Sequence, residues 1–227
     1  MITGKRGFLG SKLNDVDGKC IHTRWLGVER KFHNDPMQFD NLQIVRDLFD
    51  EDYSEFIGFG SQAEFHGGQT MYARAKLAAR ILSRELCEKN EINWKWARIY
   101  SVYGPGDGQN KLLMNVIRRL LLGETVYLNG CDKLWDYLYI DDAADMLNSI
   151  IASDDKDMVY EVAYGESFNL RDILEYVAEK VGSGKLLFSN EYAGSNLVLK
   201  GESLFTPKVD IYTGLERTIE WVKAHSY

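Results

Sequence analysis

Residues 55–76 read EFIGFGSQAEFHGGQTMYARAK, and this stretch decides the fold of the chain. Residues 55–61 are mostly apolar or small and predict a buried strand that ends at Ser61. Met71 begins a run with few helix breakers that continues to Lys89, which predicts one long helix. A strand followed closely by a helix is the unit from which parallel sheets are built, so we expect an α/β fold.

Strand-like and helix-like segments alternate along the rest of the chain. Strands are predicted at 1–3, 19–25, 92–100, 125–130, 136–140 and 158–165. Helices are predicted at 41–49, 111–124, 141–153, 167–182 and 210–225, with Asn169 as a helix cap. The alternation is typical of a mostly parallel sheet flanked by helices. The crowded short segments after Gly104 indicate a small C-terminal lobe beside it.

The composition narrows the class of protein. The chain has 227 residues, of which 45% are hydrophobic, and a net charge of -7 with a pI near 5.2. Nucleic-acid binding needs a basic face, so we expect no nucleic-acid partner. Three well-separated cysteines without histidines at zinc spacing predict reduced thiols and no metal site. We expect no membrane span and no signal peptide, and therefore a cytoplasmic protein.

Tyr72 and Lys76 lie four residues apart on the predicted helix that follows Ser61. Residues at this spacing share one helix face, so a phenol and an ammonium point to the same place. A nearby cation favours the phenolate, and lowering the pKa of a tyrosine from 10 to about 7 takes roughly 4 kcal/mol. Ser61 can bind the same substrate oxygen. A tyrosine and a lysine alone are more often an ordinary exposed helix face, but Ser61 and the glycines described next favour a site.

Gly4, Gly7 and Gly10 lie between a short N-terminal strand and an expected helix. Glycines at such a turn let the backbone approach a pyrophosphate, and the N-terminus of the helix would supply amide donors. An ordinary N-terminal turn explains three glycines equally well.

Five segments resemble a known family, in the order in which that family carries them. They are TGKRGFLG (3–10), GSQAEF (60–65), YARAK (72–76), ARIYSVYGPG (97–106) and WDYLYIDDAADML (135–147). Together they resemble the extended short-chain dehydrogenase/reductase superfamily, in its NAD(P)-dependent nucleotide-sugar epimerase/dehydratase branch. The resemblance implies a Rossmann-like cofactor domain formed by 1–104 and 135–165, and a small substrate-binding lobe formed by 105–134 and 166–227.

The resemblance also implies roles for individual residues. Tyr72 would be the general acid/base of hydride transfer at a sugar carbon, Lys76 would lower its pKa and hold the nicotinamide ribose, and Ser61 would bind the reacting oxygen. NADP(H) or NAD(H) would lie on Gly4, Arg6, Gly7, Phe8, Leu9, Gly10, Tyr72, Lys76 and Tyr100. The nucleotide-sugar substrate would contact Ser61, Gln62, Ser101, Lys111 and Trp135.

The chain departs from the family pattern near its start. Too few residues separate Gly10 from Ile21 for a complete βαβ unit, which needs about 30. Segment 19–25 therefore matches the fourth family strand better than the second, which leaves strands two and three and the adenosine pocket missing. If it were the second strand, the acidic residue at the ribose would be Glu29. Arg6 favours NADP(H) if it reaches a ribose 2′-phosphate, and is otherwise a solvated loop residue.

The segment after the predicted strand bears on the reaction. The family's dehydratases resemble one another in a Thr-Asp-Glu segment, and this chain has Ser61, Gln62 and Ala63 there. A 4-epimerase or a 4-keto-sugar reductase is therefore expected instead of a dehydratase. His66, in the turn before Tyr72, is either a spare acid or a surface histidine.

Two further expectations concern partners. Trp135 stands where many relatives have an arginine that holds the substrate's diphosphate, and Lys111 or Lys133 would have to replace it. We expect a homodimer that pairs the helices at 41–49 and 71–89. The alternative to an enzyme is a degenerate, non-catalytic relative that binds a nucleotide sugar or a protein partner, because the family's second and third strands are missing.

Overall fold

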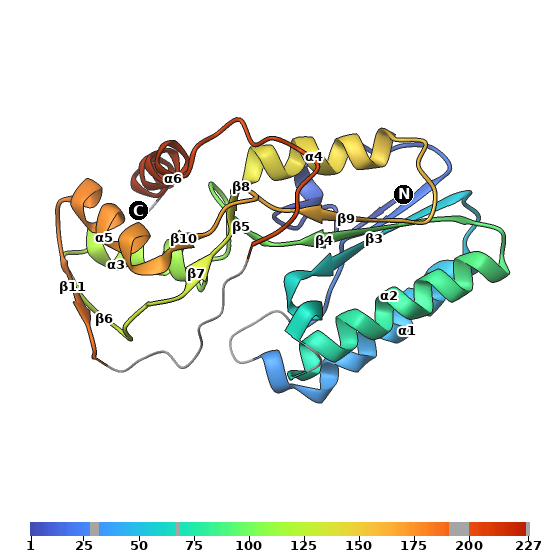
Figure 1. The fold of residues 1–227 in the computed structure, drawn as a ribbon, viewed down its shortest axis with the longest axis horizontal. Helices are drawn as coiled ribbons and strands as arrows, with labels where there is room; N and C mark the ends of the chain where they lie inside the picture. Colours follow the sequence, from blue (N-terminus) through green and yellow to red (C-terminus); the bar gives the residue numbers. More distant parts are fainter. Residues whose placement is uncertain (28–31, 67–68, 191–199, 226–227) are drawn as a thin grey trace. The chain divides into compact units, whose positions relative to one another are not determined.

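The computed structural model describes residues 1–27, 32–66, 69–190 and 200–225 (Figure 1). The chain divides into two compact units. The first consists of Met1–Tyr100 with Ala143–Val162, and the second of Ser101–Asp142 with Ala163–Tyr227. Each unit is described by itself.

A five-stranded parallel sheet forms the centre of the first unit, as the alternation of segments predicts. In spatial order its strands are β1 (Ile2–Thr3), β2 (Lys19–His22), β3 (Glu55–Ser61), β4 (Asn93–Ile99) and β9 (Met158–Val162). The helices α1 (Asn41–Asp47) and α2 (Met71–Lys89) cover one face, and α4 (Ile140–Ala152) covers the other (Figure 1). Short 3-10 turns lie at Gly10–Lys12, Phe32–Asn34, Pro36–Asp40, Leu48–Asp50 and Gln62–His66.

The position of β2 identifies it. In a doubly wound sheet with the order 3-2-1-4-5-6, the first strand has the second and the fourth as its neighbours, and the second lies away from the fourth. Here β2 lies between β1 and β3, so it occupies the place of the fourth strand. The described chain between Gly10 and Lys19 contains no strand, which agrees with the prediction that strands two and three are missing.

The helix expected after the glycines was a wrong prediction. Residues Gly10–Lys12 form one 3-10 turn, and the backbone of Leu13 is already extended. The chain must return to the sheet at Lys19, and the intervening segment includes Asn14, Asp15, Asp17 and Gly18, all poor helix formers. The backbone of Asn14 instead donates to Asn148 Oδ1 at 2.8 Å, which ties this segment to α4.

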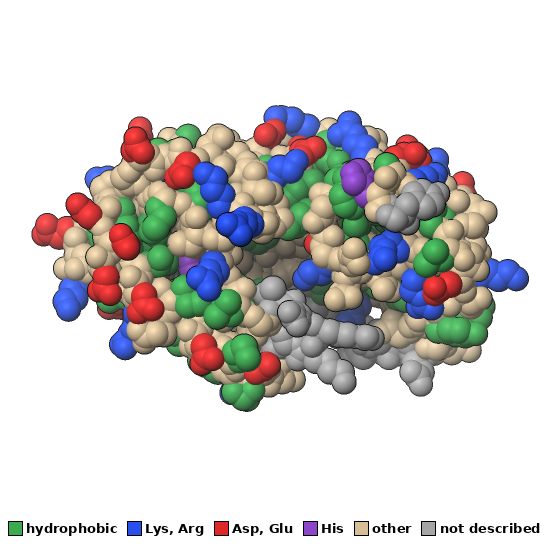
Figure 2. Space-filling view, turned by 180° about the vertical axis from the view of Figure 1, so that it is seen from behind, with side chains coloured by type: hydrophobic (Ala, Val, Ile, Leu, Met, Phe, Trp, Pro, Cys, Tyr) green, Lys and Arg blue, Asp and Glu red, His purple; other side chains and the backbone are tan. Residues whose placement is uncertain are grey.

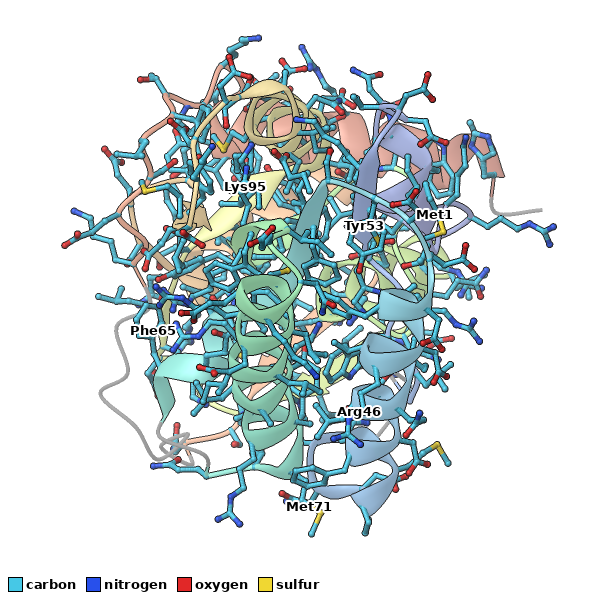
Figure 3. The ribbon with its side chains drawn as sticks, turned by 90° about the vertical axis from the view of Figure 1, so that its right-hand side faces the viewer. Met1, Arg46, Tyr53, Phe65, Met71 and Lys95 are labelled. Atoms are coloured by element: carbon cyan, nitrogen blue, oxygen red, sulfur yellow. The ribbon has the colours of Figure 1, made fainter. Side chains whose placement is uncertain are left out.

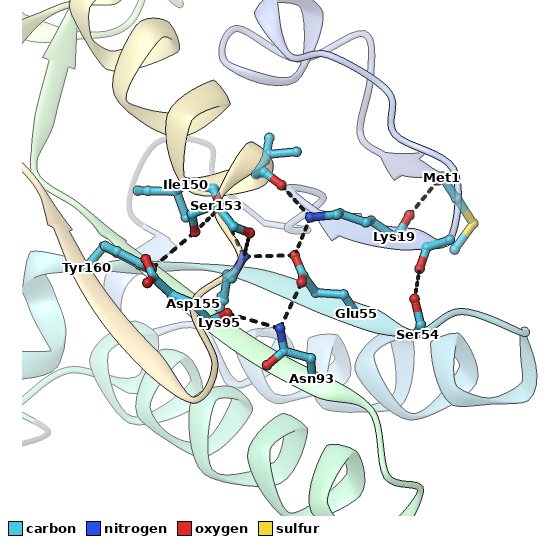
Figure 4. Close-up of polar contacts among 12 residues, drawn as sticks. Met1, Lys19, Ser54, Glu55, Asn93, Lys95, Ile150, Ser153, Asp155 and Tyr160 are labelled. Atoms are coloured by element: carbon cyan, nitrogen blue, oxygen red, sulfur yellow. Dashed lines mark hydrogen bonds and ion pairs between the residues drawn. The ribbon is translucent and has the colours of Figure 1, made fainter.

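A buried ionic cluster joins the sheet to α4 at the amino end of the strands (Figure 4). Lys95 is fully buried, and its Nζ lies 3.0 Å from Glu55 Oε1. The same ammonium donates to the carbonyls of Ile150 and Ser153 at 3.2 and 2.6 Å. Lys19 adds a second cation 3.0 Å from Glu55 Oε1. Because the last carbonyls of a helix have no partners within it, these lysines both cap α4 and neutralise the carboxylate.

In its described residues, the second unit contains three two-stranded sheets and three helices. The pairs are β5 (Ser101–Tyr103) with β8 (Tyr137–Tyr139), β6 (Thr125–Leu128) with β11 (Lys185–Phe188), and β7 (Leu134–Trp135) with β10 (Phe168–Asn169). The helices are α3 (Leu112–Leu121), α5 (Leu170–Val181) and α6 (Ile211–His225). Asn169 caps α5 as predicted, because its side chain accepts from the backbone of Arg171 and Asp172.

Surface charge and the hydropathy of the helices relate to the expectations about nucleic-acid and membrane partners. On the face in Figure 2, lysines and arginines are interspersed with aspartates and glutamates. No helix in the described part of the chain combines the length and the apolar character that a membrane crossing requires.

Replacing Lys95 by methionine is expected to lower the free energy of unfolding by about 3 kcal/mol, the usual cost of removing one partner of a buried ion pair. The substitution leaves the carbonyls of Ile150 and Ser153, at the end of α4, without this donor and Glu55 with a single cation. Urea unfolding measures the change, and Lys89→Met on the exposed end of α2 is the control. Equal stability of the two variants would show that the cluster does not hold α4.

Candidate active site

The carboxyl ends of β1, β2 and β3 bring the predicted site residues of the first unit to one edge of the sheet. Thr3, His22 and Ser61 are the last residues of these strands. Parallel strands end at the same edge, which is where open α/β sheets bind their ligands. The hydroxyl of Thr3 lies 2.9 Å from His22 Nδ1, so the ends of β1 and β2 are tied together directly.

Ser61 and Tyr72 meet through their side chains. Thr70 caps α2 by accepting from the backbone of Ala73 at 3.1 Å, which places Tyr72 in the first helical turn. The side chain of Ser61 lies close enough to that of Tyr72 to affect its pKa. Burial raises the pKa of Tyr72 above its usual 10, and the interaction with the Ser61 side chain acts in the opposite direction. The phenol is therefore protonated at neutral pH.

Lys76 lies one helical turn beyond Tyr72, on the same face. Its side chain is buried, and Nζ donates to the carbonyl of Phe59 at 2.8 Å. The ammonium lies 5.9 Å from the centre of the Tyr72 ring. Burial lowers the pKa of Lys76 to about 7, although the Glu64 carboxylate acts in the opposite direction. Ser61, Tyr72 and Lys76 therefore lie near one another. The expectation that Lys76 lowers the pKa of Tyr72 is not met, because burial of the phenol dominates and raises that pKa.

Trp25 covers the ammonium of Lys76, a contact that the sequence pattern did not indicate. The centre of the indole lies 3.7 Å from Lys76 Nζ, within the range of a cation–π contact. The same ring meets the ring of Tyr72 edge-on, with centroids 6.1 Å apart. Trp25 was predicted as part of a strand, but β2 ends at His22 and Trp25 belongs to the following loop.

Glu64 is a second residue that the sequence did not single out. Its buried carboxylate turns back on the end of β3, where Oε1 accepts from the backbone of Ser61 at 2.8 Å and from Trp96 Nε1 at 3.1 Å. Oε2 lies 3.6 Å from Arg98 Nε and 3.8 Å from Arg80 Nε. Glu64 therefore fixes the backbone that carries Ser61. An acidic side chain three residues after a strand end was the available signal.

The three predicted glycines lie in one turn, and the space around each of them is different. Gly4 has a φ of +75°, and the backbone of Gly7 donates to its carbonyl at 2.8 Å. A Cβ would lie 2.6 Å from Thr23 Oγ1 at Gly4 and 2.3 Å from the Gly4 carbonyl at Gly10, so the chain's own packing demands both glycines. At Gly7 the nearest atom is 3.2 Å away, which is tight but leaves the backbone open to a ligand. These roles match those of the glycines in a dinucleotide-binding turn.

The residues present fit one end of a dinucleotide. Gly7 offers an open backbone for a pyrophosphate, and Ser61, Tyr72 and Lys76 suit a nicotinamide ribose and a reacting oxygen. His22 Nε2 is buried and has no hydrogen-bond partner in the described part of the chain, which suits a ligand group at this edge. The adenosine end is different, because the described residues contain no counterparts of the second and third strands of a complete doubly wound sheet.

Residues 51–163 match the family model described as NAD dependent epimerase/dehydratase family. The chain carries a domain of this family. It is 25% identical over 189 residues to a dTDP-glucose 4,6-dehydratase from an Actinoplanes strain, covering 78% of this chain and 58% of the relative. The chain therefore spans less than two thirds of the length of that relative.

Solved structures of similar fold cover nearly all of the chain. One is RMD from Pseudomonas aeruginosa in complex with NADPH, with a TM-score of 0.84, 16% identity, and coverage of 99% of this chain and 98% of that one. Another is MoeE5 in complex with UDP-glucose and NAD, with a TM-score of 0.82, 18% identity, and coverage of 100% and 99%. At these identities the likeness concerns the fold alone.

The epimerase/dehydratase domain contains Ser61, Tyr72 and Lys76, whereas the glycine turn and Trp25 precede the matched residues. Arg6 is exposed, and Phe8 and Leu9 are half-buried within that turn. The side chain of His66 and all of Glu29 lie outside the described residues.

Other predicted site residues have individual settings. Tyr100 is buried in the first unit, and its hydroxyl donates to Glu161 Oε2 at 3.1 Å. Gln62 is half-buried in the 3-10 turn after Ser61. In the second unit, Trp135 Nε1 donates to the hydroxyl of Ser101. Lys111 is exposed just before α3, and Lys133 is half-buried.

Lys76 is expected to make stability rise with pH. The folded state holds it with a pKa near 7 and the unfolded state near 10.5, so between these values the unfolded state binds more protons. The cost of burying the charge is complete below pH 7 and disappears as pH rises toward 10.5. From pH 6.5 to pH 9.5 this adds on the order of 3 kcal/mol to the parent but nothing to Lys76→Met.

Urea unfolding of the parent and Lys76→Met at both pH values measures this difference. Lys89→Met, an exposed lysine of the same helix, should keep the pH dependence of the parent. Parallel pH profiles for the parent and Lys76→Met would contradict a depressed pKa at Lys76.

Proposed function

We propose that the protein is an NAD(P)-dependent nucleotide-sugar epimerase or 4-keto-sugar reductase. The observation that carries the proposal is the proximity of the Ser61 and Tyr72 side chains, with Lys76 one turn away on the same helix face and 5.9 Å from the Tyr72 ring centre. The family match supports it, since it covers these three residues. RMD, solved with NADPH, and MoeE5, solved with UDP-glucose and NAD, share the fold.

The first unit is the proposed cofactor domain. Gly4, Gly7 and Gly10 would hold the pyrophosphate, with Arg6, Phe8 and Leu9 beside it and Tyr100 nearby. Lys76 would bind the nicotinamide ribose. When bound, the nicotinamide supplies or accepts a hydride.

Tyr72 would move the proton that accompanies hydride transfer. A protonated phenol is the form that donates, and burial keeps Tyr72 in that form. Ser61 would hold the sugar oxygen that receives the proton, because its side chain lies close to the phenol of Tyr72. The arrangement suits reduction of a keto-sugar directly, whereas an epimerase must also use Tyr72 as a base in the reverse step.

The second unit is the proposed substrate-binding lobe. Gln62, a residue of the first unit, is also proposed to contact the substrate. The indole N–H of Trp135 is already used by Ser101, so Trp135 offers its ring face for stacking on a base or a sugar. Lys111, exposed before α3, would supply a positive charge for the diphosphate.

A non-catalytic relative is the second candidate, and specific observations favour it. The glycine turn leads into a three-residue 3-10 turn instead of a helix, and the strands that would carry an adenosine pocket do not occur in the described chain. Such a protein would bind a nucleotide sugar or a protein partner without turnover.

Calorimetric titration with NADH and NADPH separately tests the proposal. We expect micromolar binding of one of them, weakened at least tenfold in Lys76→Ala because the ribose loses its ammonium partner. Tyr72→Phe should bind the cofactor like the parent but reduce a panel of UDP-, dTDP- and GDP-linked 4-keto-hexoses roughly 100-fold more slowly, the usual contribution of a general acid.

Arg6→Ser is the matched variant for the cofactor's phosphate. A loss of NADPH binding with unchanged NADH binding would assign Arg6 to the 2′-phosphate. If neither nucleotide binds the parent at millimolar concentration, the enzyme proposal fails and the non-catalytic candidate remains.

We further propose that the protein is a homodimer formed by α1 and α2, which lie side by side (Figure 3). A groove of about 670 Å³ runs between them. Its apolar lining includes Phe39 and Ile81, which are 40% and 53% exposed. Arg46 and Glu85 lie on the same surface, so a two-fold axis can place Arg46 against Glu85 of the partner subunit.

Sedimentation velocity tests the dimer. Arg46→Glu should weaken the dimer at least tenfold, because like charges then face each other across the axis. Adding Glu85→Arg to that variant should restore association. A parent protein that sediments as a monomer at high micromolar concentration would rule this interface out.

A further inference from the structure

Among the described residues, two groups contact the ammonium of Lys76 directly. One is the carbonyl of Phe59, which accepts from Nζ at 2.8 Å. The other is the ring of Trp25, whose centre lies 3.7 Å from Nζ. The lysine is only 5% exposed. A ribose hydroxyl cannot take the place of the indole on this ammonium while Trp25 stays where it is.

The indole is held in this position by buried polar side chains. Trp25 Nε1 donates to Gln38 Oε1 at 2.8 Å, and Gln38 is fully buried. Gln38 Nε2 donates in turn to the carbonyl of Gly27 at 2.8 Å. Asn41, also buried, accepts from the backbone of Leu26 at 2.7 Å. The loop is therefore anchored at the indole of Trp25 and at the two residues that follow it.

The physical reason for the contact is the burial of a cation. An ammonium taken out of water must be compensated, and an aromatic face does so by electrostatic attraction to the charge. Without Trp25, one side of the Lys76 ammonium would have to find water or a ligand. The indole thus acts as an internal ligand.

We propose that Trp25 sets the affinity of this site: its indole takes the ligand's place on Lys76, and a nicotinamide nucleotide reaches Lys76 only by displacing it. This inference rests on the proposed function, because it names the cofactor as the displacing ligand.

The glycine turn is connected to this displacement. A Cβ at Gly4 would lie 2.6 Å from Thr23 Oγ1 and 2.9 Å from the backbone nitrogen of Arg24, so the turn packs against the residues just before Trp25. Thr23 Oγ1 also donates to the carbonyl of Thr3 at 2.6 Å. A pyrophosphate on the glycine turn and the movement of Trp25 would act through the same short segment.

The first experiment compares nucleotide affinity in Trp25→Leu, Trp25→Phe and the parent by calorimetric titration with NADH and NADPH. Trp25→Leu should bind about tenfold more tightly, the fold-change that a desolvated cation–π contact is worth. Trp25→Phe keeps a smaller aromatic face and should lie between the other two. Trp221→Phe, on α6 of the second unit, should bind like the parent.

A second experiment needs no nucleotide. Acetic anhydride acylates free amines, and a lysine with a pKa near 7 is largely unprotonated at pH 8. Mass spectrometry of the peptide that carries Lys76 should show at least tenfold faster labelling in Trp25→Leu than in the parent. Labelling of exposed Lys89 provides the internal standard, and near-ultraviolet circular dichroism verifies that the variant is folded.

The outcomes separate the two proposals. If the parent and Trp25→Leu bind the nucleotide equally well, this inference is overturned while the proposed function stands. If neither binds, the proposed function is wrong and the nucleotide is not the displacing ligand, and the labelling rates then test only whether the indole closes Lys76. Unchanged rates overturn it, and faster labelling in Trp25→Leu supports the indole as the group that closes Lys76.

Discussion

The position of the candidate site depends on one packing constraint, the indole of Trp96 lying across β3. A Cβ at Gly58 would come within 2.3 Å of that ring and one at Gly60 within 2.2 Å, so only glycines permit the contact. Trp96 Nε1 then meets the Glu64 carboxylate, which also accepts from the backbone of Ser61. Since the side chain of Ser61 acts on that of Tyr72, the geometry of the site follows from the packing of the core.

Two lysines among the described residues of the first unit are buried, and their charges are compensated in different ways. Lys95 lies 3.0 Å from a carboxylate and donates to two carbonyls at the end of α4. The folded chain itself therefore compensates its charge. Lys76 contacts one carbonyl and one indole, and burial lowers its pKa to about 7 although the Glu64 carboxylate acts in the opposite direction. A fully paired lysine suits a structural joint between sheet and helix. A lysine with incomplete compensation retains the capacity to bind a further group, which is what the proposed role of Lys76 requires.

The parts of the fold that the sequence predicted are those governed by local pattern. The strand at 55–61 and the helix at 71–89 were predicted with the bounds that the structure has, because each is long and has clear limits. The helix after Gly10 failed because the length of the connection overrode the glycine pattern. Trp25 and Glu64 were missed because their partners, Lys76 and Trp96, lie far away in sequence. For Glu64 the one local signal was an acidic side chain three residues after the end of β3.

The shortened sheet and the covered lysine are related through binding energy. A dinucleotide gains affinity from its adenosine, pyrophosphate and nicotinamide ends, and the described chain lacks the strands that would serve the first. Without that contribution, a nicotinamide ribose would meet Lys76 less often, and the buried ammonium needs another partner in the meantime. Trp25, which hydrogen-bonds to Gln38, is such a partner for the ammonium. It lies in the loop that follows β2. The absence of the adenosine-binding strands at one end of the proposed site therefore gives a physical reason for the contact between the Trp25 indole and Lys76 at the other end.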